Sequence, residues 1–430
     1  MSTYPHNITA EYHTLGCKLN FSETSAIGRA LNRRGVRRAA DGETPDIVVV
    51  NTCSVTETAD KKGRSLIRRL AARYPQAAIV VTGCYAQLKP GEVASLPGVE
   101  LVLGSGEKLK AAEYVDRFLQ SRQSVTEVTP ARQISTFEPS CERGDRTRWF
   151  LKVQDGCDYF CTYCTIPYAR GRSRSGIITD LVNRARMAAG EGAKEIVITG
   201  VNIGEFGSDN GQSFFDLIRE LDTVQGIERY RISSIEPNLL TDEIIDWVAQ
   251  SRAFMPHFHI PLQSGSDRVL KLMNRRYATA LFRERVEHIR RVMPHAFIGV
   301  DVIAGARGET EREWAEACRF IESLPVSRLH VFPYSERPGT AALHLPDPVP
   351  QAEKHRRVEQ LIAISDAKLR LFLDSQHGAE RPVLWEHTVH DGMMQGFTDN
   401  YVRVQAPFNA EMVNRISNLV LDSDNIVAEQ

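Results

Sequence analysis

The 430-residue sequence predicts an α/β protein made of three consecutive parts. Apolar strand-like runs alternate with helical stretches over most of the chain, and short β-like runs replace this alternation near its end. Such alternation is typical of parallel sheets, because each helix brings the chain back to the end of the sheet where the previous strand began, so that the next strand runs in the same direction. We expect an N-terminal parallel α/β sheet domain (residues 6–120), a linker (121–146), a partial (β/α)6 barrel (147–375) and a small C-terminal β-barrel (376–430).

The N-terminal part contains four apolar runs with helical stretches between them. We expect strands over residues 8–13, 46–51, 78–82 and 99–103, and helices over 22–34 and 57–74. Cys17, Cys53 and Cys84 each follow one of the first three strands. Ligands of open α/β sheets bind outside the carboxyl ends of the strands, so the three loops are expected to converge on one site.

Residues 121–146 are polar, contain Pro130 and Pro139, and predict a linker. Six further strands are expected after it, over residues 149–154, 195–201, 230–235, 257–262, 297–303 and 328–334. Six β/α units indicate a partial, open form of the β/α barrel, whose chemistry lies at the carboxyl ends of the strands. Cys157, Cys161 and Cys164 follow the first of these strands as C-x3-C-x2-C.

Each cysteine triad offers three thiolates, which leaves one iron of a 4Fe-4S cluster open to a substrate or cofactor. The alternative for the compact triad is a zinc knuckle, but structural zinc takes four protein ligands and no His or Cys stands at zinc-finger spacing beyond Cys164. Disulfides require an oxidising compartment, and MSTYPHNITAEYH lacks the basic start and apolar core of an export signal. We therefore expect reduced cytosolic thiols. Cys318 fits core packing, and Cys141 lies in the linker.

Polar residues alternate with apolar ones along the barrel strands, which is unusual for a β/α barrel. The positions expected to face the lumen carry Lys152, Gln154, Arg231, Ser233, His257, His259, Gln263, Asp301 and His330. Burial of a polar group without a partner costs roughly 1–3 kcal/mol, so we expect a lumen that holds water or a polar ligand. A polar network satisfied by its own members is the alternative.

The formal net charge of −1 predicts nothing about nucleic acid, but basic residues gather locally. They form four runs, at residues 33–38, 61–73, 143–148 and 170–174. Any one run is more often a solvated helix face, whereas four of them near the cysteines favour a polyanionic partner. No apolar stretch approaches the roughly 18 residues of a membrane span, so we expect no membrane partner.

The segment LKVQDGCDYFCTYCTIPYARGRSRS (residues 151–175) resembles radical S-adenosylmethionine (SAM) enzymes. Together with HTLGCKLNFSET, VVNTCSVTETADKK and VTGCYAQ around Cys17, Cys53 and Cys84, it makes the chain similar to the methylthiotransferase family over essentially its whole length. The resemblance implies transfer of a methylthio group to an unactivated carbon, on adenosine 37 of certain tRNAs or on a ribosomal-protein aspartate. The N-terminal part, residues 6–120, then corresponds to the family's N-terminal domain, which holds an auxiliary cluster.

The resemblance also implies the cofactors, which are SAM and two 4Fe-4S clusters. Cys157, Cys161 and Cys164 would hold the cluster that reduces SAM, and Cys17, Cys53 and Cys84 the auxiliary cluster that carries sulfur. It suggests Thr199, Gly200, Ser234, Glu236 and Gln263 as contacts of SAM or the lumen. The implied partners are a tRNA anticodon stem-loop, an electron donor such as flavodoxin or ferredoxin, and a sulfur source, all in the cytoplasm.

The C-terminal part resembles the TRAM domain, an OB-like RNA-binding module. Its β-like runs cover residues 383–387, 397–405 and 417–422, and GFTDNYVRV (396–404) is the best-matching stretch. Exposed Phe397, Tyr401 and Arg403 would contact RNA by stacking and charge. The alternative is that Phe397 and Tyr401 belong to the barrel core.

Within the family, HTLGCKLN, TADKK, RISSIEPNLL and GFTDNYVRV resemble the branch that converts N6-threonylcarbamoyladenosine to its 2-methylthio form. Arg231 and Arg307 are the candidate partners of the threonylcarbamoyl carboxylate. One departure is Ala306-Arg307, where many relatives have Phe-Pro. Methylthiotransferases acting on isopentenyladenosine or on a ribosomal protein, and a non-catalytic RNA-binding metalloprotein, remain as alternatives.

Overall fold

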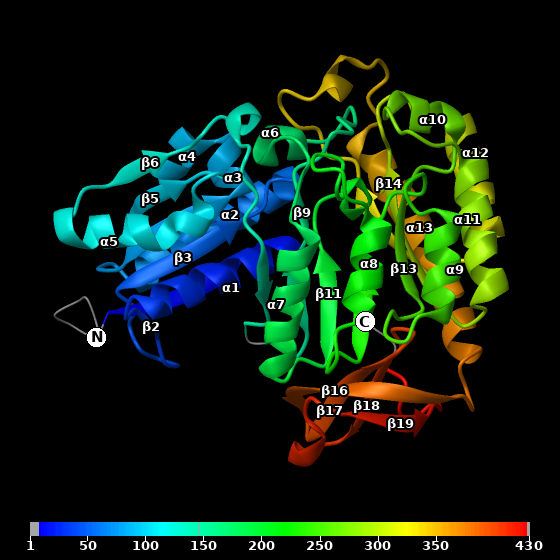
Figure 1. Cartoon of the computed structure of the whole chain (residues 1–430). Coiled ribbons are helices and arrows are strands. Elements are labelled where there is room, and N and C mark those ends of the chain that lie inside the picture. Colours follow the sequence, from blue (N-terminus) through cyan, green and yellow to red (C-terminus); the bar gives the residue numbers. More distant parts are fainter. Residues whose placement is uncertain (1–7, 145, 428–430) are drawn as a thin grey trace.

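The computed structural model describes residues 8–144 and 146–427 and contains three parts in contact (Figure 1). The N-terminal sheet and its helices lie beside the barrel, and the C-terminal sheet lies beneath the barrel, at the end opposite helix α6 (Ile166–Arg170). The predicted fold class, with a parallel sheet, a partial barrel and a small β domain, is confirmed. Residues 1–7, 145 and 428–430, on which the outer limits of the expected domains fall, lie outside the described residues.

The N-terminal sheet has six parallel strands in the order β2-β1-β3-β4-β5-β6. Strands β3 and β4 are buried on both faces because each is a run of β-branched residues covered by helices on either side. The elements are β1 (Thr9–Thr14), α1 (Lys18–Arg33), β2 (Arg37–Arg38), β3 (Ile47–Thr52), α2 (Glu57–Arg73), β4 (Ala78–Gly83), α3 (Cys84–Leu88), α4 (Pro90–Ala94), β5 (Val99–Leu103), η1 (Lys108–Lys110), α5 (Ala111–Ser121) and β6 (Val125–Glu127).

The expected linker is only partly irregular. Its first strand, β6, extends the N-terminal sheet by pairing with β5, and η2 (Ala131–Gln133) follows. Its second strand, β7 (Ser140–Glu142), pairs antiparallel with the first barrel strand and buries Cys141 in the barrel core. The segment is therefore built into both neighbouring sheets.

The barrel contains all six predicted strands, and these run parallel to one another. Single bridges such as Ser234 to His259 join β12 to β13, so the sheet is open there. The strands are β8 (Trp149–Lys152), β11 (Glu195–Thr199), β12 (Arg229–Ile232), β13 (His257–Gln263), β14 (Phe297–Ala304) and β15 (Arg328–Pro333), with the short hairpin β9 (Gln154–Asp155) and β10 (Arg174–Ser175) after β8.

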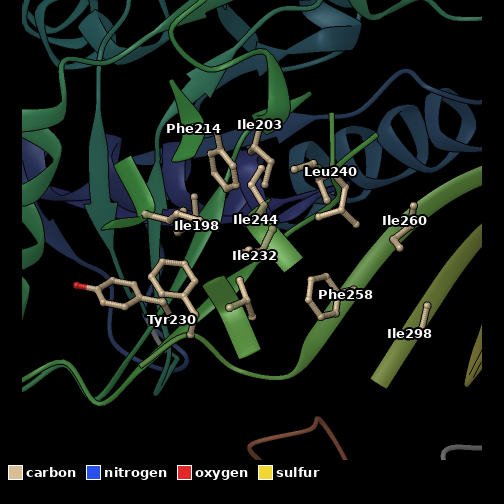
Figure 2. Close-up of a cluster of buried hydrophobic side chains, with 14 of the residues drawn as sticks. Ile198, Ile203, Phe214, Tyr230, Ile232, Leu240, Ile244, Phe258, Ile260 and Ile298 are labelled. Carbon is tan, nitrogen blue, oxygen red and sulfur yellow. The ribbon is translucent and has the colours of Figure 1, made fainter. Parts of the chain in front are cut away.

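Helices cover the outer face of the barrel. They are α7 (Ile178–Gly190), α8 (Phe214–Asp222), α9 (Asp242–Gln250), α10 (Asp267–Leu272), α11 (Thr279–Val292), α12 (Glu311–Ser323) and α13 (Gln351–Asp374), with short η3 (Ile203–Glu205) and η4 (Ala341–His344). Figure 2 shows strand residues Ile232, Phe258 and Ile260 meeting Leu240 and Ile244 in the core between strands and helices. Among the described residues, no helix has the length and apolar composition of a membrane span.

The C-terminal part is an antiparallel sheet in the order β18-β17-β16-β19. Its strands are β16 (Glu380–His390), β17 (Met393–Thr398), β18 (Arg403–Pro407) and β19 (Ile416–Val420), with η5 (Ala410–Met412) between the last two. The run expected over residues 397–405 is in fact two strands. The chain turns between them at Tyr401, whose φ is 68°.

Two buried arginines of β12 hold this sheet against the barrel. Arg229 donates to the carbonyl oxygens of Phe397 (2.9 Å) and Pro382 (2.7 Å). Arg231 donates to the carbonyl oxygens of Thr398 (2.7 Å) and Asp399 (2.8 Å), and to Glu195 (2.8 Å). Arg229 is the first residue of β12 and Arg231 the third, and the sheet that they hold lies at the end of the barrel opposite α6 (Figure 1). Arg231 therefore has a structural role, which corrects its expected role as a substrate contact.

Candidate functional site

The compact cysteine triad forms one tight loop after β9. Gly156 begins it with φ 72°, and a Cβ there would lie 1.9 Å from the carbonyl oxygen of Arg172, so the position requires glycine. Each sulfur accepts a hydrogen bond: Cys157 from the Tyr159 amide (3.5 Å), Cys164 from the Ile166 amide (3.4 Å) and Cys161 from the Arg275 guanidinium (3.1 Å). Donors of this kind stabilise thiolates that bind iron.

The dispersed triad is brought together by three loops at one edge of the N-terminal sheet. Cys17 stands at the start of α1, Cys53 follows β3, and Cys84 begins α3 directly after β4. A Cβ on Gly16 would lie 2.7 Å from Cβ of Cys53, which shows how closely two of these loops approach. Burial, together with the neighbouring thiols of Cys84 and Cys17, raises the pKa of Cys53 to about 12. Iron would have to displace these protons on binding.

The spacing of the thiols bears on the kind of metal group they suit. Within the described part of the chain, no three His, Cys, Asp or Glu side chains are arranged to hold a single metal ion. Three sulfurs bound to one zinc would all lie about 2.3 Å from it, whereas the cysteines of an iron-sulfur cluster bind separate irons and stand further apart. Three thiolates per triad fit the three protein-bound irons of a 4Fe-4S cluster whose fourth iron is open.

A buried charge network lies between the two triads. Arg170, at the end of α6, contacts Glu23 (3.0 Å) and Asp155 (2.9 Å). Lys152 binds the same two carboxylates at 3.0 and 2.7 Å, and Lys108 binds Glu23 at 2.8 Å. Arg174 also lies 3.7 Å from Asp155, so the network has four cations for two anions and carries an excess of positive charge. Burial raises the pKa of Cys84, and Arg170 opposes this rise, which places the excess charge beside the dispersed triad.

An inter-domain cavity of about 260 Å³ lies between the loop of the compact triad and the loop that follows Cys53. Its wall includes Cys164 from the compact triad and Val55 and Thr56 from the loop that carries Cys53. Gln263 and Asp301 line it from the barrel lumen. One chamber therefore touches both triad loops and the inner face of the barrel.

The expected SAM contacts lie at the carboxyl ends of the strands. Thr199 is buried at the end of β11, and a Cβ on Gly200 would lie 2.9 Å from Oε1 of Gln154. Ser234 is at the bridge to His259, and Gln263 lines the inter-domain cavity. Glu236 is an ion-pair partner of Arg275, the arginine that donates to Cys161.

The structure adds three residues that the sequence analysis did not single out as SAM contacts. Gln154 accepts hydrogen bonds from the amides of Val201 (3.0 Å) and Asn202 (2.9 Å) and so fixes the loop after β11. Both side-chain amide atoms of Asn202, and Oγ of Ser233, are buried without a hydrogen-bond partner. Unpartnered buried polar atoms that follow two adjacent barrel strands indicate groups that await a ligand. Only the polar pattern after each strand pointed to this region.

Some polar residues of the lumen form a network satisfied by its own members, and others line cavities that a ligand could enter. Lys152 and Arg231 are satisfied by buried carboxylates, as the self-satisfied network requires. His259, in contrast, bonds Asp301 at 2.7 Å and stacks on His330 at a ring distance of 4.9 Å, and this group lines cavities. Lys152 and Arg231 are thus structural, whereas His259, Asp301 and His330 line cavities.

Two further expectations about substrate contacts need correction. Arg307 is tied to Glu336 (2.7 Å) and to the carbonyl oxygens of Leu343 and Leu345, so it anchors a surface loop. Phe397 and Tyr401 are half-buried and stack on one another at 5.0 Å, with Arg148 over Phe397 at 4.5 Å. Their ring faces are occupied by protein and are not the exposed platforms that RNA stacking needs.

The basic runs also divide into buried and exposed residues. Arg148, Arg170 and Arg174 are largely buried in ion pairs or hydrogen bonds and belong to the structure. Helix α2 presents the exposed cations of the second run: Lys61, Lys62, Arg68, Arg69 and Arg73.

The fold and the two cysteine sites define a radical SAM enzyme with an additional N-terminal domain. Residues 151–321 match the radical SAM superfamily, which implies SAM and a 4Fe-4S cluster, and residues 9–104 match the family described as uncharacterized protein family UPF0004. A radical SAM methyltransferase from Kitasatospora setae, TsrM, has a similar fold, with a TM-score of 0.55 and 15% identity over 76% of this chain and 73% of that one.

Sequence comparison identifies the family. The chain is 40% identical over 95% of its length to "Threonylcarbamoyladenosine tRNA methylthiotransferase MtaB" of Bacillus subtilis, covering 92% of that protein. It is 34% identical over 92% of its length to the protein of the same name from Aquifex aeolicus, covering 95% of it. A "tRNA-2-methylthio-N(6)-dimethylallyladenosine synthase" of Thermobifida fusca is 33% identical over 83% of this chain and 74% of its own length. The chain belongs to the methylthiotransferase family of radical SAM enzymes.

Proposed function

We propose that this chain is a tRNA methylthiotransferase that acts on C2 of N6-threonylcarbamoyladenosine at position 37 and yields the 2-methylthio derivative. Relatives that are 40% and 34% identical to this chain carry this activity in their names. The observation that carries the proposal is the inter-domain cavity, because its wall joins the loops of both cysteine triads to the polar lumen. A substrate carbon in that chamber would be within reach of both.

The two triads would each hold a 4Fe-4S cluster, at Cys157, Cys161 and Cys164 and at Cys17, Cys53 and Cys84. When bound, the first supplies the electron that cleaves SAM, and the second supplies the sulfur. Arg275 donates to Cys161 and pairs with Glu236, so it would stabilise the charge of the bound thiolate and hold the loop. The excess positive charge of the Arg170 network would do the same for the dispersed triad.

The methionine and ribose groups of SAM would bind at the carboxyl ends of β11, β12 and β13. Asn202 and Ser233 offer unpartnered buried atoms there, beside the expected Thr199, Gly200, Ser234, Glu236 and Gln263. Gln154 would keep the loop after β11 in place by its two accepted amide hydrogen bonds.

The RNA would contact the exposed cations of α2 and the C-terminal sheet, which we interpret as a TRAM domain. Phosphate contacts of this kind make binding dependent on salt. A cytoplasmic electron donor such as flavodoxin or ferredoxin and a separate sulfur source complete the set of proposed partners.

The separate roles of the triads provide the first test. Replacement of Cys157, Cys161 and Cys164 by Ala should abolish formation of 5′-deoxyadenosine, because SAM then lacks its reducing group. Replacement of Cys17, Cys53 and Cys84 should leave some SAM cleavage and end methylthiolation. Methylthiolated product from the second variant without added sulfide would contradict the assignment, as would stoichiometric zinc without sulfide in the wild-type protein.

The substrate is tested by competition between three acceptors. Purified enzyme would receive a tRNA bearing threonylcarbamoyladenosine, a tRNA bearing isopentenyladenosine and a ribosomal protein. We expect product only from the first. Turnover of either of the others with none on the first would overturn the substrate and leave the methylthiotransferase chemistry in place.

A further inference from the structure

A second cavity, of about 280 Å³, lies where all three parts of the chain meet. Lys18 comes from the N-terminal part, next to Cys17, and Arg403 comes from the C-terminal sheet. The barrel contributes His259, Arg328 and His330, and Phe297, Leu369 and Phe372 form an apolar side. No Asp or Glu lines this cavity within residues 8–144 and 146–427. Its wall is therefore basic on one side and apolar on the other.

The titratable groups in the wall report a positive potential. Burial would raise the pKa of Tyr401, but Lys18, Arg148 and Arg231 together lower it below the ordinary value. Burial and the neighbouring cations, Arg231 and Lys18 among them, lower the pKa of His257, which is therefore neutral. The lowered pKa of Tyr401 has the sign that a surplus of cations produces, since burial alone would raise it, so a bound anion would be stabilised here.

A buried polar atom in the same wall lacks a partner. His257 is 5% exposed, and its Nδ1 makes no hydrogen bond in the described structure. An orphan ring nitrogen of a neutral imidazole suits a ligand hydroxyl, which both donates and accepts and so fits either tautomer. The cavity thus presents cations for an anion, one partner for a hydroxyl and an apolar side for a methyl group.

The cavity adjoins the reaction chamber. His259, in its wall, is hydrogen-bonded at 2.7 Å to Asp301, which lines the inter-domain cavity. A group attached to a base in the chamber would have to extend past the His259–Asp301 pair, towards the amino ends of the strands, to meet this wall.

We propose that this basic cavity is the subsite for the threonyl group of the modified base, with Lys18 and Arg403 binding its carboxylate and His257 its hydroxyl. The assignment rests on the proposed function. Lys18 and Arg403, which line a cavity, take the role of carboxylate partners that the sequence analysis gave to Arg231 and Arg307. The guanidinium of Arg403 bonds Gln395 through Nε and Nη2, which leaves its other nitrogen available. The half-apolar wall favours an amino-acid side group, which has a methyl group to bury, over a backbone phosphate, which has none.

The test measures how each variant distinguishes a charged from a neutral substrate. Two anticodon stem-loops would be used, one with threonylcarbamoyladenosine and one with its carboxamide, which has the same shape and no charge. Affinity would be measured with the cluster-loaded full chain. A charge-assisted hydrogen bond contributes about tenfold to a hundredfold in affinity, so the wild type should prefer the carboxylate RNA by at least about tenfold. Lys18→Gln and Arg403→Gln should each remove most of this preference.

Matched controls separate the possible outcomes. Lys271→Gln, an exposed lysine on α10 outside the cavity, should keep the full preference. Iron and sulfide content would show whether Lys18→Gln disturbs the neighbouring Cys17, and Arg403→Gln tests the subsite away from the cysteines. An unchanged preference in both variants, or an equal loss of affinity for both RNAs as a phosphate contact would give, overturns the subsite. A wild-type enzyme that fails to methylthiolate the carboxylate RNA overturns the proposed function instead.

Discussion

Arg170 shows how one residue links the two cysteine sites. It ends the helix that follows the compact triad, yet its guanidinium reaches Glu23 and Asn20 of helix α1 in the N-terminal part. A buried charge is expensive unless paired, and here the pairing partners come from a different domain. The position of each triad relative to the other is therefore fixed by charge as well as by packing.

Arg170→Met tests this link. The change removes the guanidinium that donates to Glu23, Asp155 and Asn20, and a buried acceptor that loses its donor costs about 1–3 kcal/mol. We expect a clear fall in the urea midpoint of unfolding. Arg172→Met, two residues on, is the control: its side chain is 67% exposed and contacts Asp158 only at 3.4 Å, so its effect should stay within about 0.5 kcal/mol. Equal midpoints for the two variants would contradict the role of Arg170.

His330 makes stability depend on pH. Burial and the neighbouring His259 lower its pKa from 6.5 to about 4, although Asp301 opposes this. Between about pH 6.5 and pH 4 the unfolded chain therefore binds a proton that the folded chain does not, and stability falls as the pH falls. His330→Asn should flatten this dependence by up to about 1.4 kcal/mol per pH unit. Unfolding midpoints at pH 7, 6 and 5 measure it, with exposed His355→Asn as the control; an identical slope in the two variants would refute it.

At the scale of the element, the turn after β4 positions Cys84. Gly83 has φ 95°, and an added Cβ would lie 2.3 Å from the carbonyl oxygen of Thr52 and 2.5 Å from Oδ1 of Asn51. Both contacts belong to the neighbouring strand β3 and its end, so they cannot yield without moving Cys53 as well. The glycine thus sets the distance between two loops of the dispersed triad.

Gly83→Ala should therefore damage the proposed auxiliary cluster selectively. We expect reconstituted iron to fall from about eight towards about four per chain, with SAM cleavage retained, because the compact loop is untouched. Gly91→Ala in α4 is the matched control, since no atom lies within 4 Å of its added Cβ. A full iron content in Gly83→Ala would show that this turn does not position a ligand.

The sequence predicts elements well where they have apolar faces. The six barrel strands were found because residues such as Phe258 and Ile260 repeat with the period of a strand whose outer face is buried. Strands β6 and β7 were missed because a three-residue edge strand has no such period. The roles of Arg231 and Arg307 were missed because both donate to backbone carbonyl groups of distant segments. The residue types near each arginine do not indicate such partners.

At the scale of the molecule, both cavities exist only because separate parts of the chain meet. The inter-domain cavity needs Val55 and Thr56 beside Cys164, and this contact is held by Arg337, which bonds Ser54 and Asp60 at 2.8 Å. The basic cavity needs the C-terminal sheet against the barrel. The sheet is therefore part of the substrate site as well as a surface for RNA.

Removal of residues 377–430 should consequently have two effects. It removes Arg403 and Tyr401 from the basic cavity and uncovers Phe297 and Phe372, which now pack against the sheet. We expect a lower thermal midpoint together with RNA affinity at least about tenfold weaker, while SAM cleavage measured below that midpoint persists, because the compact triad lies at the other end of the barrel. Retention of full RNA affinity by the truncated chain would contradict this.

A variant that keeps the C-terminal sheet but weakens its contact with the barrel tests whether the sheet must be docked in place or need only be present. Arg229→Met with Arg231→Met removes four hydrogen bonds to the sheet and leaves every residue of the basic cavity in the chain. If the sheet acts by completing the cavity, this variant should lose the preference for the carboxylate RNA over its carboxamide and keep most of its salt-dependent affinity for both, since the exposed cations of α2 remain. If the preference is intact, the sheet contributes to RNA binding without shaping the site, and the cavity formed by the three parts is not what selects the substrate.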